Sequence, residues 1–374
     1  MDLRLDETLE HLHRTGPEFD GWLSNHGPMA ADALLRIAPG ADVRRWTARY
    51  ARRLEPLPEP RWAIAEQDWG EYWGDPSRLG DWVAFFDRAV RERPWREVLA
   101  TWWPRLLPGS LASATHGLIR TGHAVRELRE ARTAPRLTEL GQALGYWAAR
   151  WQPMPLAVPR LGDPRATDRP VLHLGDDPGA AGSGTVPREP GAAGDPGVAD
   201  LEAVLDAAPR LGQVGGARTR IALAGARREW AVYARRAAGV PADIPEGLAR
   251  VRDAAVTAYD RWGHGNAIMM VHAATAPRAA GLVLPALDPA LWPMTYQWAW
   301  ATTKLLVAVY RPGTPRLPRD VGDGDDLAGQ VADHGDEHVV KFAEVAFEAA
   351  ARGRGGASSA VEQAMAGISP LRGR

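Results

Sequence analysis

The sequence contains no cysteine among its 374 residues. A disulfide framework, a thiolate nucleophile and any zinc or iron–sulfur site with cysteine ligands are therefore excluded. An excess of charge of either sign is also missing, since 45 basic and 46 acidic residues give a formal net charge of −1. This balance leaves no basic footprint for nucleic acid and no polybasic patch for a membrane, so we expect neither as a partner.

Long uninterrupted apolar runs are absent as well. Residues 1–7 contain no apolar run of the kind that a signal peptide needs. The most apolar long stretch, residues 291–310, includes Gln297 and Lys304. These polar residues favour a buried helix over a membrane span. We therefore expect a cytoplasmic protein.

The pattern that remains is helical. A chain of 374 residues with 45% hydrophobic residues can bury a large core. Apolar residues recur with helical spacing along most of it, and no βαβ repeat appears. We predict an all-α fold, a single large multi-helix domain with a metal site between helices. Two helical halves, 1–157 and 200–374, would form this one domain, with a disordered Gly/Pro/Asp-rich insertion at 158–199 between them.

Lysine is nearly missing from the chain. Of the 45 basic residues, only Lys304 and Lys341 are lysines. A buried lysine can lose its proton and become a nucleophile, whereas arginine effectively cannot. Lys341 follows His338 by three residues and so shares a helix face with it. The alternative for such a residue is a solvated charge on the surface of a helix.

Several histidines have helical spacing that suits a shared site. His116 and His123 lie on one helix face, two turns and roughly 10.5 Å apart between Cα atoms, so both rings could lean toward one ion. His272 and Thr275 also share a face, one turn apart. His26 would lie at a helix N-terminus, because capping residues and an early proline surround it.

Two alternatives use the same residues differently. His334, Glu337 and His338 fit the inverted zinc-peptidase pattern and would make a zinc-dependent hydrolase, although Gly335 argues against one continuous helix through both histidines. In the other alternative, the protein is a non-catalytic helical ligand-binding protein whose histidines satisfy hydrogen bonds in the core. Under any of these functions, the 16 tryptophans fill the core or wall a pocket for a flat aromatic ligand.

Four short motifs follow one another along the chain, separated by long unrelated spacers. Each is weak alone, but the ordered set resembles the questin oxidase-like family over most of the chain except the insertion. The motifs are Ser24-Asn25-His26-Gly27-Pro28-Met29-Ala30; Thr115-His116-Gly117-Leu118-Ile119-Arg120 through His123-Ala124; Val271-His272-Ala273-Ala274-Thr275-Ala276; and His338-Val339-Val340-Lys341.

The resemblance implies an all-helical enzyme. Members of that family include fungal enzymes that open anthraquinone rings oxidatively, with a non-haem iron held by four histidines and a carboxylated lysine. His26 and Thr275 would lie beside the open iron position and handle protons and substrate oxygens; His26 as a ligand in place of His338 stays open. The implied iron ligands are His116, His123, His272, His338 and, as a carbamate, Lys341.

We therefore expect a non-haem Fe(II) oxygenase that oxidises or cleaves the ring of an aromatic polyketide with dioxygen. Imidazole and carboxylate-type oxygen suit Fe(II), and a neutral buried lysine can add carbon dioxide to give such an oxygen. No Gly-rich βαβ fingerprint for a flavin or a nicotinamide is present, so NADPH stays open without a binding motif. The sequence leaves open the exact substrate, the number of oxygen atoms incorporated and the oligomeric state.

Overall fold

The computed structural model describes residues 3–155, 196–234, 239–317 and 326–371. These residues form sixteen α-helices and two short strands, β1 (Glu18–Phe19) and β2 (Leu23–Ser24), which pair in an antiparallel hairpin. The predicted all-α fold class is therefore confirmed. The predicted insertion at 158–199 lies outside the described residues except for 196–199, where helix α8 already begins at Val198.

The helices occupy most of the described chain, and short 3-10 turns, among them Ala112–Thr115, join several of them. In chain order they are α1 (Leu3–Leu12), α2 (Gly27–Ile37), α3 (Val43–Ala51), α4 (Leu79–Glu92), α5 (Trp95–Leu106), α6 (His116–Glu130), α7 (Ala134–Arg150), α8 (Val198–Asp206), α9 (Ala217–Gly225), α10 (Arg228–Ala234), α11 (Ile244–Trp262), α12 (Ala267–Val283), α13 (Trp292–Tyr310), α14 (Leu327–His334), α15 (Glu337–Ala351) and α16 (Ala357–Gly367).

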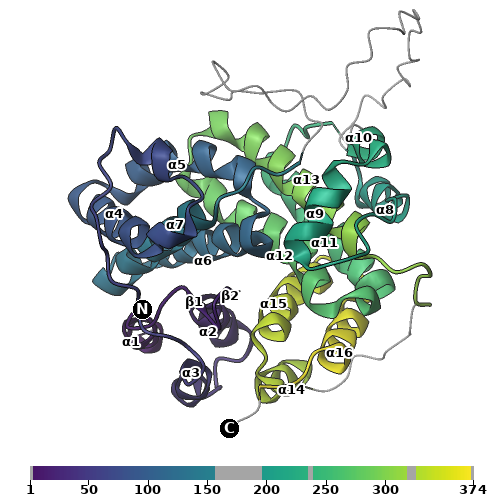
Figure 1. Ribbon diagram of the computed structural model, residues 1–374. Coiled ribbons are helices and arrows are strands. Elements are labelled where there is room, and N and C mark those ends of the chain that lie inside the picture. The colour runs from purple at the N-terminus through teal and green to yellow at the C-terminus, as the bar shows by residue number, and fades with distance from the viewer. Residues whose placement is uncertain (1–2, 156–195, 235–238, 318–325, 372–374) are drawn as a thin grey trace, which may run out of the picture.

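Four of these helices meet in a closed ring. Helix α2 packs against α6, α6 against α12, α12 against α15, and α15 against α2. Figure 1 shows α12 near the centre of the molecule, with α6 on one side and α15 below it. Two of the four helices come from the N-terminal part of the chain and two from the C-terminal part. A site inside this ring therefore draws on both halves of the sequence.

Glycines let α6 approach its neighbours closely. A Cβ atom on Gly117 would come within 2.5 Å of Trp147 on α7, and one on Gly122 would come within 2.7 Å of the backbone oxygen of Ala279 on α12. Real Cβ atoms do not make such short contacts, so only glycine permits this packing. Because these two positions carry no side chain, the first half of α6 packs directly against α7 and α12.

The tryptophans serve mainly as core residues. Trp82, Trp102, Trp103 and Trp147 are at most 1% exposed, and Trp82 and Trp102 pack edge-to-face on each other. Such contacts between aromatic rings are favourable beyond the area they bury. These tryptophans form a second apolar cluster around α4, α5 and α7. The interpretation of tryptophan as core filler therefore holds for these four.

Helix α13 is the buried helix that the sequence predicts for residues 291–310. Its Lys304 is 3% exposed, and the Nζ atom donates a hydrogen bond of 2.9 Å to the carbonyl of Ala234. That carbonyl ends helix α10, where a cation is favourable. By length and composition the segment Ala267–Ala286 is apolar enough to cross a membrane, yet 72% of that apolar stretch is buried inside the molecule, as in the core helix of a soluble protein.

Candidate metal centre

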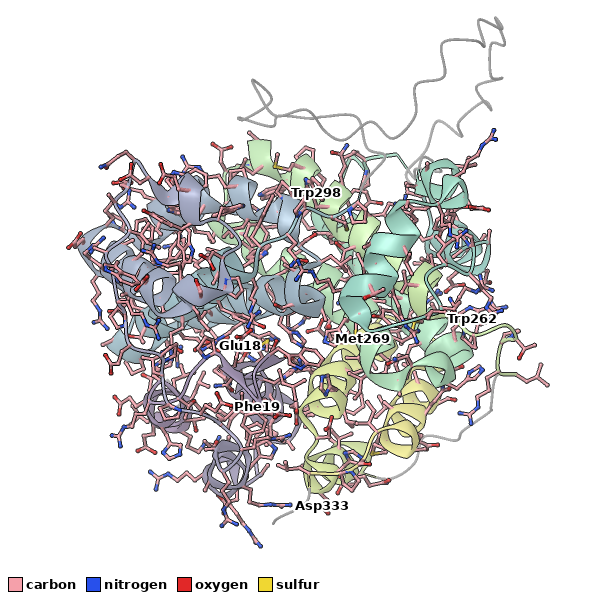
Figure 2. All side chains as sticks on the ribbon, viewed as in Figure 1. Glu18, Phe19, Trp262, Met269, Trp298 and Asp333 are labelled. Atoms are coloured by element: carbon pink, nitrogen blue, oxygen red, sulfur yellow. The ribbon has the colours of Figure 1, made fainter. Side chains whose placement is uncertain are left out.

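Four buried histidines converge inside the ring of α2, α6, α12 and α15. His26 is the residue just before α2, His116 is the first residue of α6, His272 lies in the second turn of α12, and His338 is the second residue of α15. One ring nitrogen of each lies within 4.8 Å of the corresponding nitrogen of the other three. Figure 2 shows the side chains packed between these helices, with Met269 of α12, one turn before His272, near the centre of the view.

Three of the four rings contact one another through nitrogen atoms. Nε2 of His116 lies 2.6 Å from Nε2 of His26 and 2.9 Å from Nε2 of His272. The ring of His338 lies beside that of His26, with 4.5 Å between the ring centroids. Two imidazole nitrogens that bind one divalent ion at right angles, each about 2.1 Å from it, are about 3.0 Å apart. The spacing of the group therefore fits neighbouring ligands of a single ion.

Polar side chains fix the helix starts that carry two of these histidines. Oδ1 of Asn25 accepts the backbone N–H of Gly27 at 2.9 Å, at the start of α2. The carboxylate of Asp336 caps α15 by accepting the N–H groups of His338 and Val339. Because such caps satisfy N–H groups that a helix leaves unpaired, they set the residue at which the helix begins. The caps thereby hold histidines at the positive ends of the helix dipoles, where a protonated imidazole is disfavoured.

Burial keeps three of the four rings neutral. It lowers the pKa of His26, His116 and His272 well below the usual value, and the nearby Lys341 and the neighbouring imidazoles lower these pKa values further. A neutral imidazole keeps one nitrogen lone pair, which a metal can accept. The group is therefore electrostatically suited to bind a cation and unsuited to hold a proton.

Lys341 lies beside the histidines, one turn after His338 on α15. It is 1% exposed, and its Nζ atom has no hydrogen-bond partner among the described residues. Burial lowers its pKa to about 7, against the opposing effect of the carboxylates of Glu337 and Asp336. A substantial part of the Lys341 population is thus a neutral amine near neutral pH, which is the nucleophilic form.

His123 is not part of the group, so the structure does not place it with the other predicted ligands. Its Nδ1 atom lies 2.9 Å from the carboxylate of Asp32. Burial lowers the pKa of His123 to about 4, although the hydrogen bond to Asp32 raises it. His116 and His123 do share a helix face. The ring of His123, however, lies two turns further along α6 and is hydrogen-bonded to Asp32 on α2. His26 occupies the place in the group that we expected His123 to take.

Below the histidines lies a set of charged residues that we call the charged layer: Asp32, Arg126, Arg278 and Glu344. Arg126 bonds to Asp32 at 3.0 Å and to Glu344 at 2.6 Å, and Arg278 bonds to Glu344 at 2.6 Å. Each residue comes from one of the four helices that surround the histidines. The sequence analysis missed this layer, although three of its members follow the histidine of their own segment by six residues.

Thr275 lies one turn after His272 on α12, as the spacing predicts. Its hydroxyl donates a hydrogen bond of 3.1 Å to the carbonyl of Val271 in the same helix, and the residue is 3% exposed. A hydroxyl bound in this way is oriented by its own helix. Its oxygen retains acceptor capacity for a proton donor.

The residues of the zinc-peptidase pattern are not brought together. Helix α14 ends at His334, because Gly335 adopts a left-handed conformation with φ of 67°. Nε2 of His334 lies 3.0 Å from the carbonyl oxygen of Ile368. A second set of potential ligands, Asp336, Glu337 and His338, excludes His334. Glu337 is moreover paired with Arg53, two residues after the end of α3, with 2.9 Å between the charged atoms.

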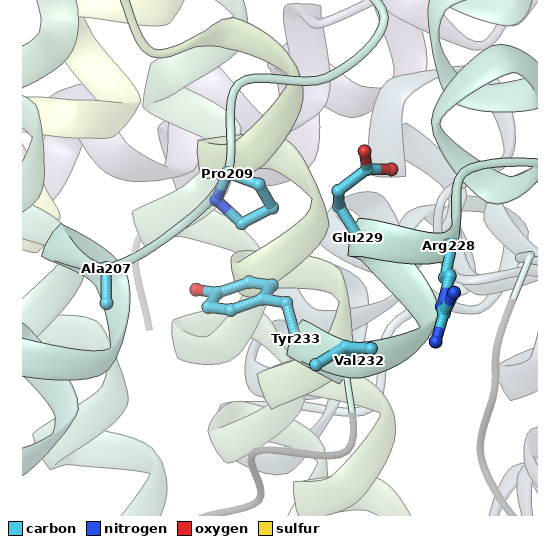
Figure 3. Close-up of a pocket in the computed structure, with 6 residues that line it drawn as sticks. All are labelled: Ala207, Pro209, Arg228, Glu229, Val232 and Tyr233. Atoms are coloured by element: carbon cyan, nitrogen blue, oxygen red, sulfur yellow. The ribbon is translucent and has the colours of Figure 1, made fainter.

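A surface pocket near α8 and α10 contains neither Lys341 nor any of the four histidines. Figure 3 shows the side chains around it, which belong to Ala207, Pro209, Arg228, Glu229, Val232 and Tyr233. The histidine group is thus distinct from this pocket.

No family model matches the chain, and no curated protein sequence matches it.

Proposed function

We propose that this protein is a non-haem Fe(II) oxygenase that oxidises or cleaves the ring of an aromatic polyketide with dioxygen. The observation that carries the proposal is the convergence of four buried imidazoles beside the buried Lys341, whose amine has no hydrogen-bond partner among the described residues. Imidazole and carboxylate-type oxygen are ligands that suit Fe(II). The ordered motifs that resemble the questin oxidase-like family support the same conclusion and suggest an anthraquinone-like substrate and a cytoplasmic enzyme.

The proposed ligands are His26, His116, His272, His338 and a carbamate on Lys341. The neutral amine of Lys341 would attack carbon dioxide, form an N–C bond and release one proton, which gives an anionic carboxylate-type oxygen. Arginine offers no such route, because its guanidinium stays protonated. Five protein ligands leave one position of an octahedron open, and bound Fe(II) would supply the one-electron chemistry that dioxygen requires.

Several residues that are not proposed as ligands would hold the ligands in place or contact the substrate. Asp336 holds the start of α15 and so positions His338 and Lys341 together, since both lie in the first two turns. The charged layer fixes the four helices to one another below the histidines. Thr275 offers an oxygen that can accept a hydrogen bond from a substrate hydroxyl. Burial of the group excludes bulk water from the place where oxygen would react.

Metal content and oxygen consumption test the proposal. We expect the purified protein to retain about one iron per chain, the ratio that a single site with open coordination requires, and to consume dioxygen with a hydroxyanthraquinone. His116→Gln and His272→Gln should lose the iron, whereas His334→Gln should keep it, because His334 belongs only to the hydrolase pattern. Loss of metal in the His334 variant, or a metal-free wild type after reconstitution with Fe(II), would contradict the proposal.

The carbamate requires a separate test. After incubation with ¹³C-bicarbonate and Fe(II), the wild-type protein should show a carbamate carbon in its ¹³C spectrum. Lys341→Arg should lack this signal, since arginine cannot add carbon dioxide. Lys304→Arg is the matched control, because Lys304 is also buried but already bonds to the carbonyl of Ala234. A signal that persists in the Lys341 variant would assign the modification to another amine.

A further inference from the structure

The backbone just before His116 has an unusual conformation. Ser113, Ala114 and Thr115 have φ values of 47°, 52° and 70°, and Asp20 and Asp326 are the only other described non-glycine residues with positive φ. The left-handed region is unfavourable for residues with a side chain, because Cβ crowds the following carbonyl. Three such residues in succession are strained, and the surrounding fold must maintain them.

The turn points the carbonyl of Ser113 at the ring of His116. In a right-handed helix that carbonyl would accept an N–H group four residues later, but here it is hydrogen-bonded to Nδ1 of His116. Since a carbonyl oxygen can only accept, Nδ1 of His116 carries the proton and Nε2 carries the lone pair. This Nε2 atom is the one that lies between His26 and His272.

Tyr146 on α7 connects the turn to the segment of His26. Its hydroxyl lies 2.5 Å from Oγ of Ser24, two residues before His26, and the side chain of Ser113 lies near enough to lower the pKa of Tyr146, against the larger effect of burial. Tyr146 is 1% exposed, so this bridge lies inside the molecule. The same hydroxyl therefore holds two chain segments, each of which supplies one histidine.

We propose that the Ser113–Ala114–Thr115 turn is a strained positioning element that fixes His116 in its Nδ1–H tautomer, and that Tyr146 is the positioning residue that locks the turn to the His26 segment. The metal readout of this inference rests on the proposed function, but the tautomer is a property of the protein alone. Because the left-handed backbone directs the Ser113 carbonyl at the ring, a substitution that tolerates this backbone should keep the tautomer, and one that disfavours it should lose the tautomer.

Substitution of Ala114 by glycine and by valine tests the proposal. Ala114→Gly accepts the left-handed conformation without crowding, so its urea midpoint should rise. Its affinity for Fe(II) should be unchanged, because the turn keeps its shape. Ala114→Val, whose β-branched side chain strongly disfavours the left-handed region, should lower the Fe(II) affinity by about 10- to 100-fold, the usual loss when the partner that orients a ligand histidine is disturbed. Ala112→Gly is the matched control two residues earlier, where φ is not positive. That variant should lower the urea midpoint and leave the Fe(II) affinity unchanged.

The tautomer provides a readout without metal. In ¹⁵N spectra of histidine-labelled, metal-free protein, the His116 ring, assigned by its loss in His116→Gln, should be protonated at Nδ1. Ala114→Gly should keep this tautomer, Ala114→Val should mix the two tautomers, and Tyr146→Phe, which keeps the aromatic ring, should do so to a smaller extent. Protonation at Nε2 in the wild type, or a folded Ala114→Val variant that keeps both its tautomer and its Fe(II) affinity, would overturn the inference. A wild type with the Nδ1–H tautomer that binds no Fe(II) would overturn the proposed function instead.

Discussion

Lys341 destabilises the metal-free protein. An amine that is 1% exposed and has no hydrogen-bond partner among the described residues has lost its hydration, and the nearby carboxylates of Glu337 and Asp336 offset this loss only in part. Leaving a buried polar group unpaired in this way costs about 1–3 kcal/mol, more if the group is charged. Natural proteins tolerate such a cost mainly at functional sites, where a destabilised residue is part of the chemistry. The position of Lys341 next to four histidines is consistent with this explanation.

Replacement of Lys341 by methionine should therefore raise stability and remove function. Methionine has a similar length and needs no hydrogen bond. In metal-free protein, Lys341→Met should increase the free energy of unfolding in urea by about 1–3 kcal/mol. The same variant should lose its affinity for Fe(II), while Lys304→Met should keep it, because Lys304 lies outside the histidine group. A lower unfolding free energy for Lys341→Met would show that the amine is stabilised in the fold.

At the residue scale, the sequence anticipated much of the candidate site but not all of it. Spacing and motif order singled out His116, His272, His338 and Lys341, which the structure brings together. The structure does not bring His123 into the group. Helical periodicity gives the face on which a residue lies, but it does not give the residue of another helix that contacts that face. Here that residue is Asp32, which belongs to a different helix and could not be paired with His123 from the sequence alone.

At the scale of elements, the position of α6 depends on its glycines. The contact between Gly122 and Ala279 involves backbone atoms of α12, which cannot move aside as a side chain can. A methyl group at position 122 must therefore push α6 and α12 apart. Since these helices carry His116 and His272, their separation changes the distance between two members of the histidine group.

Gly122→Ala should accordingly lower both stability and metal affinity. Overpacking of this kind usually costs about 1–3 kcal/mol of unfolding free energy, which urea unfolding measures. Gly281→Ala, in the same pair of packed helices, is the control, because a Cβ there would meet its nearest neighbour only at 4.0 Å. This control should gain about 0.5–1 kcal/mol from the better helix propensity of alanine. A neutral effect of Gly122→Ala would mean that the two helices can separate freely.

The element pattern was easier to predict than the packing. Capping residues and periodicity located helices such as α2 and α13, since these signals are local. Pro277 lies inside α12, which continues to Val283, although a proline inside a helix removes one backbone hydrogen bond. A helix interior tolerates proline where the fold supports it, and such support is not visible in a local pattern. Which helices meet is likewise decided by contacts between distant residues.

At the scale of the whole molecule, the ring of four helices is joined at two levels. The histidines form one level, and the charged layer below them joins the same four helices by ion pairs. Without Glu344, the two buried arginines would keep only one buried carboxylate partner among the described residues, Asp32, because the other partner of Arg278, Glu348, is 37% exposed. Arg278 and Arg126 lower the pKa of Glu344 to about 2 although burial raises it. Buried ion pairs are expensive to break, because a charge then stays behind without a partner.

Glu344→Gln should therefore lower the free energy of unfolding at neutral pH by about 3–5 kcal/mol. Because the folded pKa of Glu344 lies below the usual value of 4.5, its contribution is present above about pH 4.5 and is lost as pH falls toward 2. The variant should thus show a weaker loss of stability over this pH range than the wild type. Glu130→Gln is the control; its side chain is 49% exposed, and its pair with Arg36 should contribute less than about 1 kcal/mol.

Metal should stabilise the whole fold, because the site exists only when four distant segments are assembled. An ion that binds the folded chain alone raises the unfolding free energy by about 2.7 kcal/mol at a concentration 100 times its dissociation constant. Anaerobic Fe(II) should therefore raise the melting temperature of stripped wild-type protein, and a chelator should reverse the effect. His272→Gln should lose this shift, whereas His264→Gln should keep it, since the exposed His264 lies outside both groups of potential ligands. An equal shift in both variants would place the stabilising ion elsewhere. An ion inside the ring of four helices can stabilise the fold only by binding the histidines that line the ring, and His272 is one of them.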